Sequence, residues 1–265
     1  MCASVQTTIV RSYSLLGSST WPLKVVGHLP YRTNGTHYGS LSSVYTDGVT
    51  FAEIPMRKSI AIAGNIGTGK SSLVEFLART CGIAPFYEPN DLNPYLPSFY
   101  ENMKAWAFHS QIYFLSSKFR LHQEVDRTPG VVVLDRTIFE DAEIFASALH
   151  DMGRIDERDW ATYWGFYETI LGAIKPPDLL IYLRCSMRTL RRRIKLRGRE
   201  MEQDIPLSYL KRLDRLYEEW TANYTMSEML VLETDQLDYV SDLIHQLDVM
   251  ERIEAVIPTT FIKPS

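Results

Sequence analysis

Eight residues in the first third of the chain, Gly64 to Ser71, read G-N-I-G-T-G-K-S and fit the pattern G-x-x-x-x-G-K-[S/T]. The glycines permit backbone conformations closed to other residues, so successive N–H groups converge on phosphate oxygens at the start of the next helix. The apolar run Ser59 to Ala63 precedes the motif and a helical pattern follows, as this motif requires. The pattern therefore predicts a loop that binds a nucleoside triphosphate. Its binding residues are expected to be Gly64, Asn65, Ile66, Gly67, Thr68, Gly69, Lys70, Ser71 and Ser72.

Two side chains at the end of this loop carry the expected chemistry. Lys70 is predicted to be a solvent-facing cation that reaches the terminal phosphates, and Ser71 a ligand of Mg²⁺. A Gly-rich turn without a ligand is the alternative interpretation, and the strand before the loop disfavours it. The donor is therefore expected to be ATP with Mg²⁺.

Charged residues follow two more apolar runs. Glu88 comes after the second run, where its carboxylate is placed to take a proton from an attacking hydroxyl, although a solvated loop glutamate is equally compatible. Asp135 and Arg136 follow the third run. An acid in this position is typically the second support of Mg²⁺, and an adjacent arginine can neutralise a transferring phosphoryl group. A structural Asp–Arg pair is the alternative.

A basic segment, Arg188 to Arg199, contains seven Lys and Arg residues. A run this dense is compatible with a nucleic-acid or nuclear-import patch. The spacing favours another interpretation, because Arg193 and Arg197 are four residues apart on one helical face and Gly198 ends the helix before Arg199. This arrangement predicts a lid that closes arginine side chains over triphosphate charge.

Strands and helices alternate from Ser59 onward. Five short apolar runs predict strands buried on both faces: 60–63, 83–87, 131–134, 179–183 and 229–232. Four longer segments between them predict helices: 101–124, 139–152, 156–174 and 207–224. The expected fold is α/β, with a five-stranded parallel sheet flanked by helices and an Arg-rich lid. Ligands should bind at the carboxyl ends of the strands.

Composition limits the classes of partner. A chain of 265 residues with 45% apolar content can bury one full core, and its formal charge of -4 gives no attraction to a nucleic-acid polymer. The three cysteines are isolated from one another and from the histidines, so neither a disulfide framework nor a zinc site is predicted. No apolar run approaches the roughly 18 to 20 residues of a membrane span. A cytoplasmic protein without a membrane or nucleic-acid partner is expected.

Residues 1–55 differ from the rest of the chain. They are rich in Ser, Thr, Gly and Tyr, and they contain no acid before Asp47. We expect a disordered or leader segment, or a segment upstream of a true start at Met56, with organelle targeting as a weaker alternative. One folded domain is expected to span residues 56–265.

Six motifs occur in order between Lys58 and Asp238: the phosphate loop, Glu88-Pro, Trp106-x-x-x-x-Gln111, Asp135-Arg-Thr-Ile-Phe-Glu-Asp141, Arg193-x-x-x-Arg-Gly-Arg199 and Glu202-Gln-Asp-Ile-Pro-Leu-x-Tyr-Leu210. Together they resemble the deoxyribonucleoside kinase family, which includes deoxycytidine, deoxyguanosine and deoxyadenosine kinases. Asp135, Thr137, Phe139 and Glu140 look most like the bacterial deoxyadenosine and deoxyguanosine kinases.

The resemblance implies a P-loop kinase fold and a deoxynucleoside kinase domain over residues 56–265. It also implies transfer of the ATP γ-phosphoryl group to the 5'-hydroxyl of a deoxynucleoside, in nucleotide salvage. It assigns a role to each matching residue: Lys70, Glu88 and Arg136 as catalytic residues, Tyr100 and Glu202 on the sugar 3'-hydroxyl, Gln111 and Asp141 on the base, and Arg193, Arg197 and Arg199 as lid arginines. It also implies a homodimer formed through two helices, at about 101–124 and 139–152.

The base-reading pair favours a base that carries an amino group. A glutamine amide offers one donor face and one acceptor, and an ionised aspartate only accepts, so Gln111 and Asp141 suit adenine, cytosine or guanine better than thymine. Lys118 stands where cytidine-using members carry a second base-directed arginine, and a lysine cannot reproduce that planar fork. A purine deoxynucleoside is expected, deoxyadenosine first, with Lys118 beside the substrate.

Two rival classes share parts of the pattern. A nucleoside monophosphate kinase of the thymidylate type has the same loop, Asp–Arg pair and lid, but needs further positive charge to hold the substrate phosphate. Tyr100 and Glu202 offer a hydroxyl and a carboxylate instead. A non-catalytic P-loop subunit has no use for the predicted base Glu88.

Overall fold

The computed structural model describes residues 58–88 and 92–256, together with four short strands before residue 51. The chain divides into two units, residues 1–56 and 57–265. In the first unit, β1 (Tyr31–Thr33) pairs antiparallel with β2 (His37–Gly39), and β3 (Tyr45–Thr46) with β4 (Val49–Thr50). The rest of the leader expected over residues 1–55 lies outside the described residues.

The second unit is built on a five-stranded sheet in which every neighbouring pair is parallel. Its strands lie in the order β6-β7-β5-β8-β9. They are β5 (Lys58–Ala63), β6 (Ala84–Phe86), β7 (Val131–Asp135), β8 (Leu179–Arg184) and β9 (Glu228–Glu233). All five predicted strands are therefore confirmed, and so is the α/β fold class.

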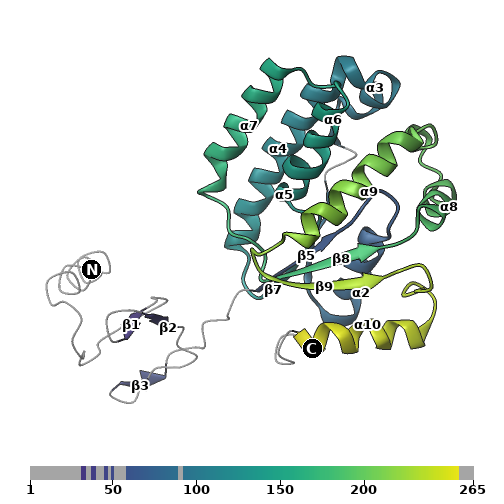
Figure 1. The fold of residues 1–265 in the computed structure, drawn as a ribbon. Helices are drawn as coiled ribbons and strands as arrows, with labels where there is room; N and C mark the ends of the chain where they lie inside the picture. Colours follow the sequence, from purple (N-terminus) through teal and green to yellow (C-terminus); the bar gives the residue numbers. More distant parts are fainter. Residues whose placement is uncertain are drawn as a thin grey trace, which may run out of the picture. The chain divides into compact units, whose positions relative to one another are not determined.

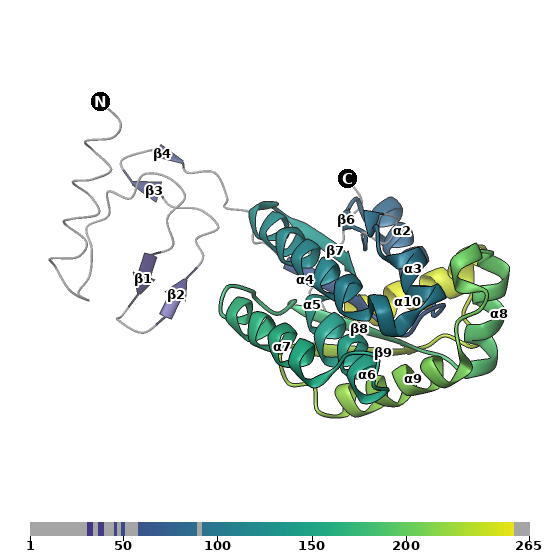
Figure 2. The same ribbon diagram turned by 90° about the horizontal axis from the view of Figure 1, so that it is seen from above.

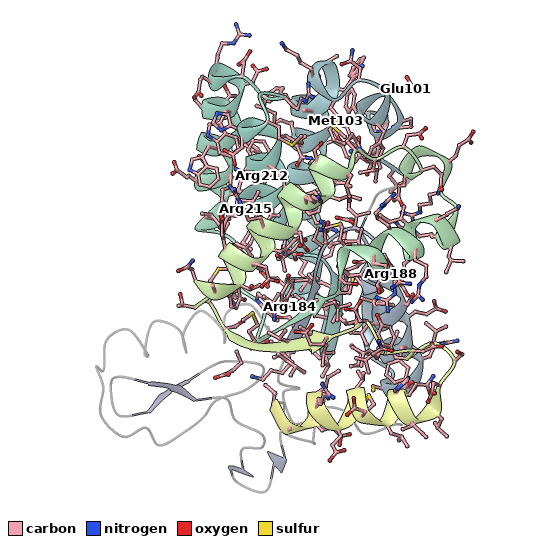
Figure 3. All side chains as sticks on the ribbon, turned by 45° about the vertical axis from the view of Figure 1, so that its right-hand side comes forward. Glu101, Met103, Arg184, Arg188, Arg212 and Arg215 are labelled. Carbon is pink, nitrogen blue, oxygen red and sulfur yellow. The ribbon has the colours of Figure 1, made fainter. Side chains whose placement is uncertain are left out.

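Helices connect the strands and cover both faces of the sheet (Figure 1). The longer ones are α2 (Lys70–Cys81), α3 (Leu96–Glu101), α4 (Met103–Arg127), α7 (Glu157–Leu171), α8 (Met187–Arg197), α9 (Leu207–Ala222) and α10 (Leu243–Val256). Arg188 on α8 and Arg215 on α9 are exposed (Figure 3). The sequence patterns did not predict α10.

Alternate residues of the central strand face opposite layers. Ile60 and Ile62 of β5 pack in a cluster with side chains of α2 and α10. Ala61 and Ala63 lie in the cluster that contains side chains of α3, α4 and α9. Because both faces of β5 are buried, its sequence is apolar at successive positions instead of alternating between apolar and polar residues. The arrangement is a three-layer sandwich, seen from above in Figure 2.

The segment predicted to be one helix over 139–152 keeps a helical backbone, but its hydrogen-bond pattern changes twice along its length. It consists of three consecutive pieces. They are α5 (Ile138–Glu140), the π-helical segment η2 (Asp141–Ala146) and α6 (Ser147–Asp151). π-Helical turns inside helices are frequent at functional sites. Most of the segment is buried within this unit. It therefore offers little surface to a second copy, and its burial does not favour the predicted dimer interface at this segment.

In the described part of the chain, no helix combines the length and apolar character needed to cross a membrane.

Candidate active site

The phosphate loop joins β5 to α2 and needs its glycines. Gly64, Gly67 and Gly69 have φ values of 147°, 84° and 102°, which are open to glycine and strained for other residues. A Cβ on Gly69 would lie 2.3 Å from the hydroxyl oxygen of Tyr239. Helix α2 begins at Lys70, so the N–H groups of its first turn point toward the loop. The loop thus has the geometry of an anion site.

Lys70 is buried rather than solvent-facing, so that prediction is wrong. Its side chain lies back over the loop, and Nζ donates to the carbonyl oxygens of Gly64 at 2.9 Å and Asn65 at 3.0 Å. Burial lowers the pKa of Lys70 to about 8, with the positive charge of Arg136 adding to the effect and nearby carboxylates opposing it. These two hydrogen bonds hold the Lys70 ammonium group against the phosphate loop, where phosphate charge is expected.

The two residues predicted to hold Mg²⁺ lie together. Ser71 Oγ donates to Asp135 Oδ2 at 2.5 Å, which joins the start of α2 to the end of β7. The second carboxylate oxygen, Asp135 Oδ1, is buried and accepts no hydrogen bond. A hydroxyl and a carboxylate with a spare lone pair are the oxygen ligands that Mg²⁺ prefers. The donor set therefore fits this ion.

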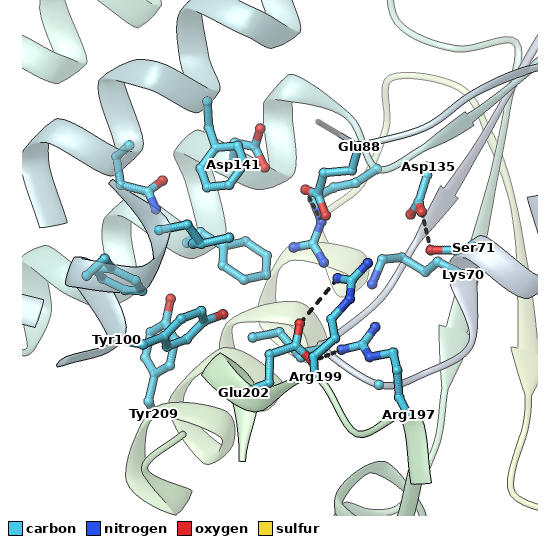
Figure 4. Close-up of a pocket in the computed structure, with 18 residues that line it drawn as sticks. Lys70, Ser71, Glu88, Tyr100, Asp135, Asp141, Arg197, Arg199, Glu202 and Tyr209 are labelled. Carbon is cyan, nitrogen blue, oxygen red and sulfur yellow. Dashed lines mark hydrogen bonds and ion pairs between the residues drawn. The ribbon is translucent and has the colours of Figure 1, made fainter. Parts of the chain in front are cut away.

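Glu88 and Arg136 form an ion pair at the carboxyl edge of the sheet. Arg136 Nε lies 3.0 Å from Glu88 Oε1, and the guanidinium lies over the ring of Phe145, 4.0 Å from its centroid. Both residues line a cavity, here named the central cavity. Its functional lining comprises Lys70, Ser71, Glu88, Tyr100, Gln111, Asp135, Arg136, Asp141, Arg197, Arg199 and Glu202 (Figure 4). With Ile66 and Gly67 of the phosphate loop, thirteen residues predicted from sequence thus surround one space.

The far end of the central cavity carries the predicted base-reading pair. Gln111 Oε1 and Asp141 Oδ2 are both buried and have no hydrogen-bond partner. Burial raises the pKa of Asp141 to about 7, although the positive charge of Lys118 opposes that shift. Buried acceptors without donors are costly, so the pair is suited to a ligand that supplies N–H groups. Phe114 and Phe145 line the cavity beside them.

Glu202 is paired with the lid. Arg197 Nη2 donates to Glu202 Oε2, and Arg199 Nη1 lies 3.4 Å from Glu202 Oε1 (Figure 4). Gly198, at φ 70°, ends α8 between the two arginines, as its position in the sequence predicts. Tyr100 lines the same cavity, and burial raises the pKa of its hydroxyl. The predicted sugar-binding carboxylate thus neutralises two predicted phosphate-binding arginines.

Arg193, the third predicted lid arginine, does not line the central cavity. Its guanidinium donates to Thr68 O and Thr234 Oγ1, both at 2.9 Å, to Thr234 O at 2.6 Å and to Leu237 O at 3.4 Å. It therefore ties α8 to the phosphate loop and to the loop after β9. Arg193 still lines a second depression, the outer hollow, which also contains Gly69, Ser72, Arg197, Asp235 and Tyr239.

Lys118 does not line the central cavity, contrary to the expectation that it lies beside the substrate. It is fully buried, and Nζ donates to the carbonyl oxygens of Asp135 and Arg136, both at 3.0 Å. The same Nζ lies 3.7 Å from Glu88 Oε1. The predicted contact with the substrate is thus replaced by contacts with the turn after β7.

The sequence did not predict two residues that hold the phosphate loop in place, Glu140 and Tyr239. Glu140 is fully buried and accepts hydrogen bonds from the backbone N–H of Gly64 at 3.3 Å, from that of Thr137 at 2.8 Å and from the hydroxyl of Tyr217 at 2.9 Å. The capping-box pattern Thr137-x-x-Glu140 was the available signal. Tyr239 donates to Gly69 O at 2.9 Å, and no local pattern marks that contact.

A model of the deoxynucleoside kinase family matches residues 60–258. The chain belongs to the deoxynucleoside kinase family. It is 35% identical over 206 residues to a deoxyadenosine/deoxycytidine kinase of Bacillus subtilis, covering 77% of this chain and 95% of that protein. It is 38% identical over 205 residues to a deoxyguanosine kinase of Lactobacillus johnsonii, covering 74% and 91%. A solved deoxyadenosine kinase from M. mycoides superposes with a TM-score of 0.65 at 31% identity, covering 74% of this chain and 99% of that one.

Deoxynucleoside kinases are transferases that phosphorylate a hydroxyl group with a nucleotide donor. The central cavity and the outer hollow share Lys70 and Ser71 in their linings. The outer hollow opens along the phosphate loop, whereas the central cavity extends from that loop to Gln111 and Asp141. The two spaces thus meet at the end of the phosphate loop, at residues that the sequence predicts to act on phosphate.

Proposed function

We propose that this chain transfers the γ-phosphoryl group of ATP to the 5'-hydroxyl of a deoxyribonucleoside, with deoxyadenosine preferred. One observation carries the proposal: the Glu88–Arg136 pair lies in a cavity with the phosphate-loop residues Lys70 and Ser71 at one end and two unpartnered buried acceptors at the other. The deoxynucleoside would occupy the central cavity, and ATP the outer hollow.

In this scheme Glu88 accepts the proton of the 5'-hydroxyl as the hydroxyl oxygen attacks the γ-phosphorus, and the bond from that phosphorus to the β–γ bridging oxygen breaks, which releases ADP. Arg136 keeps Glu88 oriented through the 3.0 Å contact and offers its remaining N–H groups to the phosphoryl oxygens. Lys70, whose ammonium is fixed by two loop carbonyls, stabilises charge on the terminal phosphates. Arg197 and Arg199 close over the donor when they leave Glu202.

Mg²⁺ is proposed to bind at Ser71 and Asp135, whose oxygens fit it. When bound, the ion neutralises developing charge on the phosphate oxygens. The short contact between the two side chains would then be replaced by contacts with the metal.

The base preference rests on Gln111 and Asp141. An adenine amino group donates to both free acceptors, while the Gln111 amide N–H₂ donates to a ring nitrogen. The O6 of guanine requires a donor, and Lys118 is committed to backbone carbonyls. Similar relatives differ in the base that they are named for, being deoxyadenosine/deoxycytidine, deoxyguanosine and deoxyadenosine kinases at 35%, 38% and 36% identity. The proposed preference for adenine therefore rests on the contacts of Gln111, Asp141 and Lys118, not on the names of the relatives.

An assay with radiolabelled ATP against the four deoxynucleosides and their monophosphates tests the function. We expect labelled monophosphate from deoxyadenosine first and from thymidine least. Labelled diphosphate from a monophosphate substrate would instead indicate a kinase of the thymidylate type. Binding of ATP without transfer to any substrate would indicate a non-catalytic subunit.

We also propose that the chain forms a homodimer through α4 and α7. These helices contact one another, and partly buried Phe108 and Ile112 on α4 and Trp164 on α7 pack on their shared cluster. Phe166 on α7 is 48% exposed. Analytical ultracentrifugation of Ile112→Asp should show a monomer, while Leu247→Asp on α10 should leave the dimer intact.

We further propose where the folded domain begins and in which compartment the protein is located. Residues 56–265 are proposed to be the kinase domain, in the cytoplasm. A chain begun at Met56 should have the kcat of the full chain, and imaging of both tagged forms should show the same distribution.

A further inference from the structure

Lys118 is a fully buried lysine beside the catalytic groups that the proposed mechanism does not use. It extends from the middle of α4, and its ammonium group meets the backbone where β7 ends. Nζ donates to Asp135 O and Arg136 O, both at 3.0 Å, and lies 3.7 Å from the Glu88 carboxylate. Two of its contacts are thus with the main chain of the two residues whose side chains are proposed to hold metal and phosphate.

The backbone at this turn is unusual. Arg136 has φ 68°, and in the described part of the chain it is the only residue other than glycine with a positive φ. Such a conformation is costly for a residue with a side chain and persists where surrounding contacts determine it. The N–H of Arg136 donates to Ile62 O at 3.0 Å, and Lys118 donates to Asp135 O and Arg136 O, the carbonyls of the two peptides that flank the Arg136 Cα. The left-handed turn is therefore fixed from the sheet and from α4.

The direction of two side chains depends on this turn. Asp135 leaves it toward Ser71, and Arg136 leaves it toward Glu88. In a right-handed or extended conformation, Arg136 would leave the backbone in another direction and lose its place over Phe145. A fixed turn therefore sets the positions of both groups at once.

We propose that Lys118 is a positioning residue: by binding both carbonyls of the Asp135–Arg136 turn it aims these two side chains at the reaction centre, and it does not read the base. This role rests on the proposed function, because the readout is transfer to a deoxynucleoside. It predicts a loss of the same size for the three bases that carry an amino group, since the misplaced groups act on phosphate and hydroxyl, and any change in the charge of Asp141 bears on these three bases alike.

Steady-state kinetics of Lys118→Met test this role. Small misplacements of reacting groups can lower rates by about 10²-fold, so we expect kcat to fall roughly 10- to 100-fold on deoxyadenosine, deoxycytidine and deoxyguanosine alike. The KM for each deoxynucleoside should change by less than about threefold, and the ratios between bases should be preserved. Lys104→Met, an exposed lysine on the same helix, is the matched control and should have wild-type kinetics.

A second variant covers the case in which Lys118→Met does not fold. Lys118→Arg keeps the buried charge and donors, so it should fold, recover part of kcat and preserve the ratios between bases. A changed ratio of deoxyguanosine to deoxyadenosine in either variant, with kcat maintained, would show that Lys118 reads the base and overturn the proposal. Wild-type kcat in Lys118→Met also overturns it. If the wild-type chain phosphorylates no deoxynucleoside, the proposed function fails as well, which the same assay shows directly.

Discussion

The two ends of the candidate active site differ in how firmly the surrounding structure holds their side chains. At the deoxynucleoside end, Glu88, Arg136 and Glu140 are held in the interior by ion pairs and hydrogen bonds. At the lid, Arg197 and Arg199 have side chains 36% and 37% exposed, and both are bonded to Glu202. At one end the proposed catalytic contacts are thus in place, whereas at the other the proposed phosphate-binding arginines would have to leave Glu202 first.

The difference reflects what each end has to do. A proton acceptor works only in a fixed geometry, and burial under α4 and the turn after β7 supplies it. A lid must open to admit and release nucleotides, so its arginines lie at the surface near Gly198, where few contacts restrain them. Breaking contacts at the first end should therefore affect turnover, while breaking them at the second should affect the affinity for the donor.

The largest effect is expected at Glu88. Glu88→Gln keeps the size of the side chain but cannot accept the proton, so kcat should fall roughly 10²- to 10⁴-fold while the KM for deoxyadenosine changes little. Steady-state kinetics measure both parameters, with the exposed Glu101→Gln as the control. A large rise in KM with kcat retained would instead make Glu88 a binding residue.

Lys70→Ala should have the next largest effect. Removing one preorganised charge from the phosphates typically lowers kcat about 10²- to 10³-fold. The variant also frees the carbonyls of Gly64 and Asn65, so thermal unfolding must be measured beside activity. Lys104→Ala is the surface control, and near-normal turnover in a folded Lys70→Ala chain would remove the phosphate loop from the mechanism.

Asp141→Ala should change selectivity rather than turnover on every base. Loss of a charged acceptor from a buried pair typically costs about 1.5 to 3 kcal/mol, roughly ten- to a hundredfold. The kcat/KM of deoxyadenosine and deoxycytidine should fall by that factor relative to thymidine, and the KM for ATP should stay constant. An equal loss on all substrates would mean that Asp141 only shapes η2.

The same carboxyl group predicts a pH dependence. Burial raises the pKa of Asp141 to about 7, so the neutral form predominates below that pH and the ionised acceptor above it. The groups that act on it are Lys118 of α4, Glu88, Arg136, Glu140 and Tyr163 of α7. The kcat/KM ratio of deoxyadenosine to thymidine should rise roughly tenfold from pH 6 to 8 as ionisation becomes nearly complete. In Asp141→Asn the ratio should be flat, and a wild-type ratio that is flat would contradict this assignment.

The smallest effect is expected at the lid. Glu202→Gln removes the charge that holds Arg197 and Arg199, and partly exposed ion pairs are worth about 1 kcal/mol or less. The KM for ATP should therefore fall about two- to fivefold, whereas the exposed Glu200→Gln should leave it unchanged. A higher KM for ATP would show that Glu202 supports the donor site instead of competing with it.

The sequence predicted the parts of this enzyme that depend on local pattern. The strands, the phosphate loop and the end of α8 at Gly198 follow from apolar runs, glycine and spacing, and the structure confirms them. The ends of parallel strands meet at one edge, so Glu88 and Asp135 were expected to lie together.

The contacts that remained unpredicted are made between elements far apart in the chain. Lys118 and Arg193 are basic residues whose targets are backbone carbonyls, and no local pattern shows which carbonyl a long side chain reaches. Lys70 was expected in solvent because its burial depends on how the loop folds back. The π-helical hydrogen-bond pattern of η2 was likewise not predicted, and η2 packs against α4 and α9.

Hydrogen exchange measured by mass spectrometry tests the contrast between the two ends most directly. We compare the free chain with the chain bound to deoxyadenosine alone and to a non-hydrolysable ATP analogue alone. The donor analogue should strongly increase protection over residues 196–203, whereas deoxyadenosine should leave the already slow exchange of α4 and residues 135–146 nearly unchanged. A lid that is fully protected without donor, together with residues 135–146 that become ordered only with deoxyadenosine, would contradict a preformed acceptor site and a lid that must exchange partners.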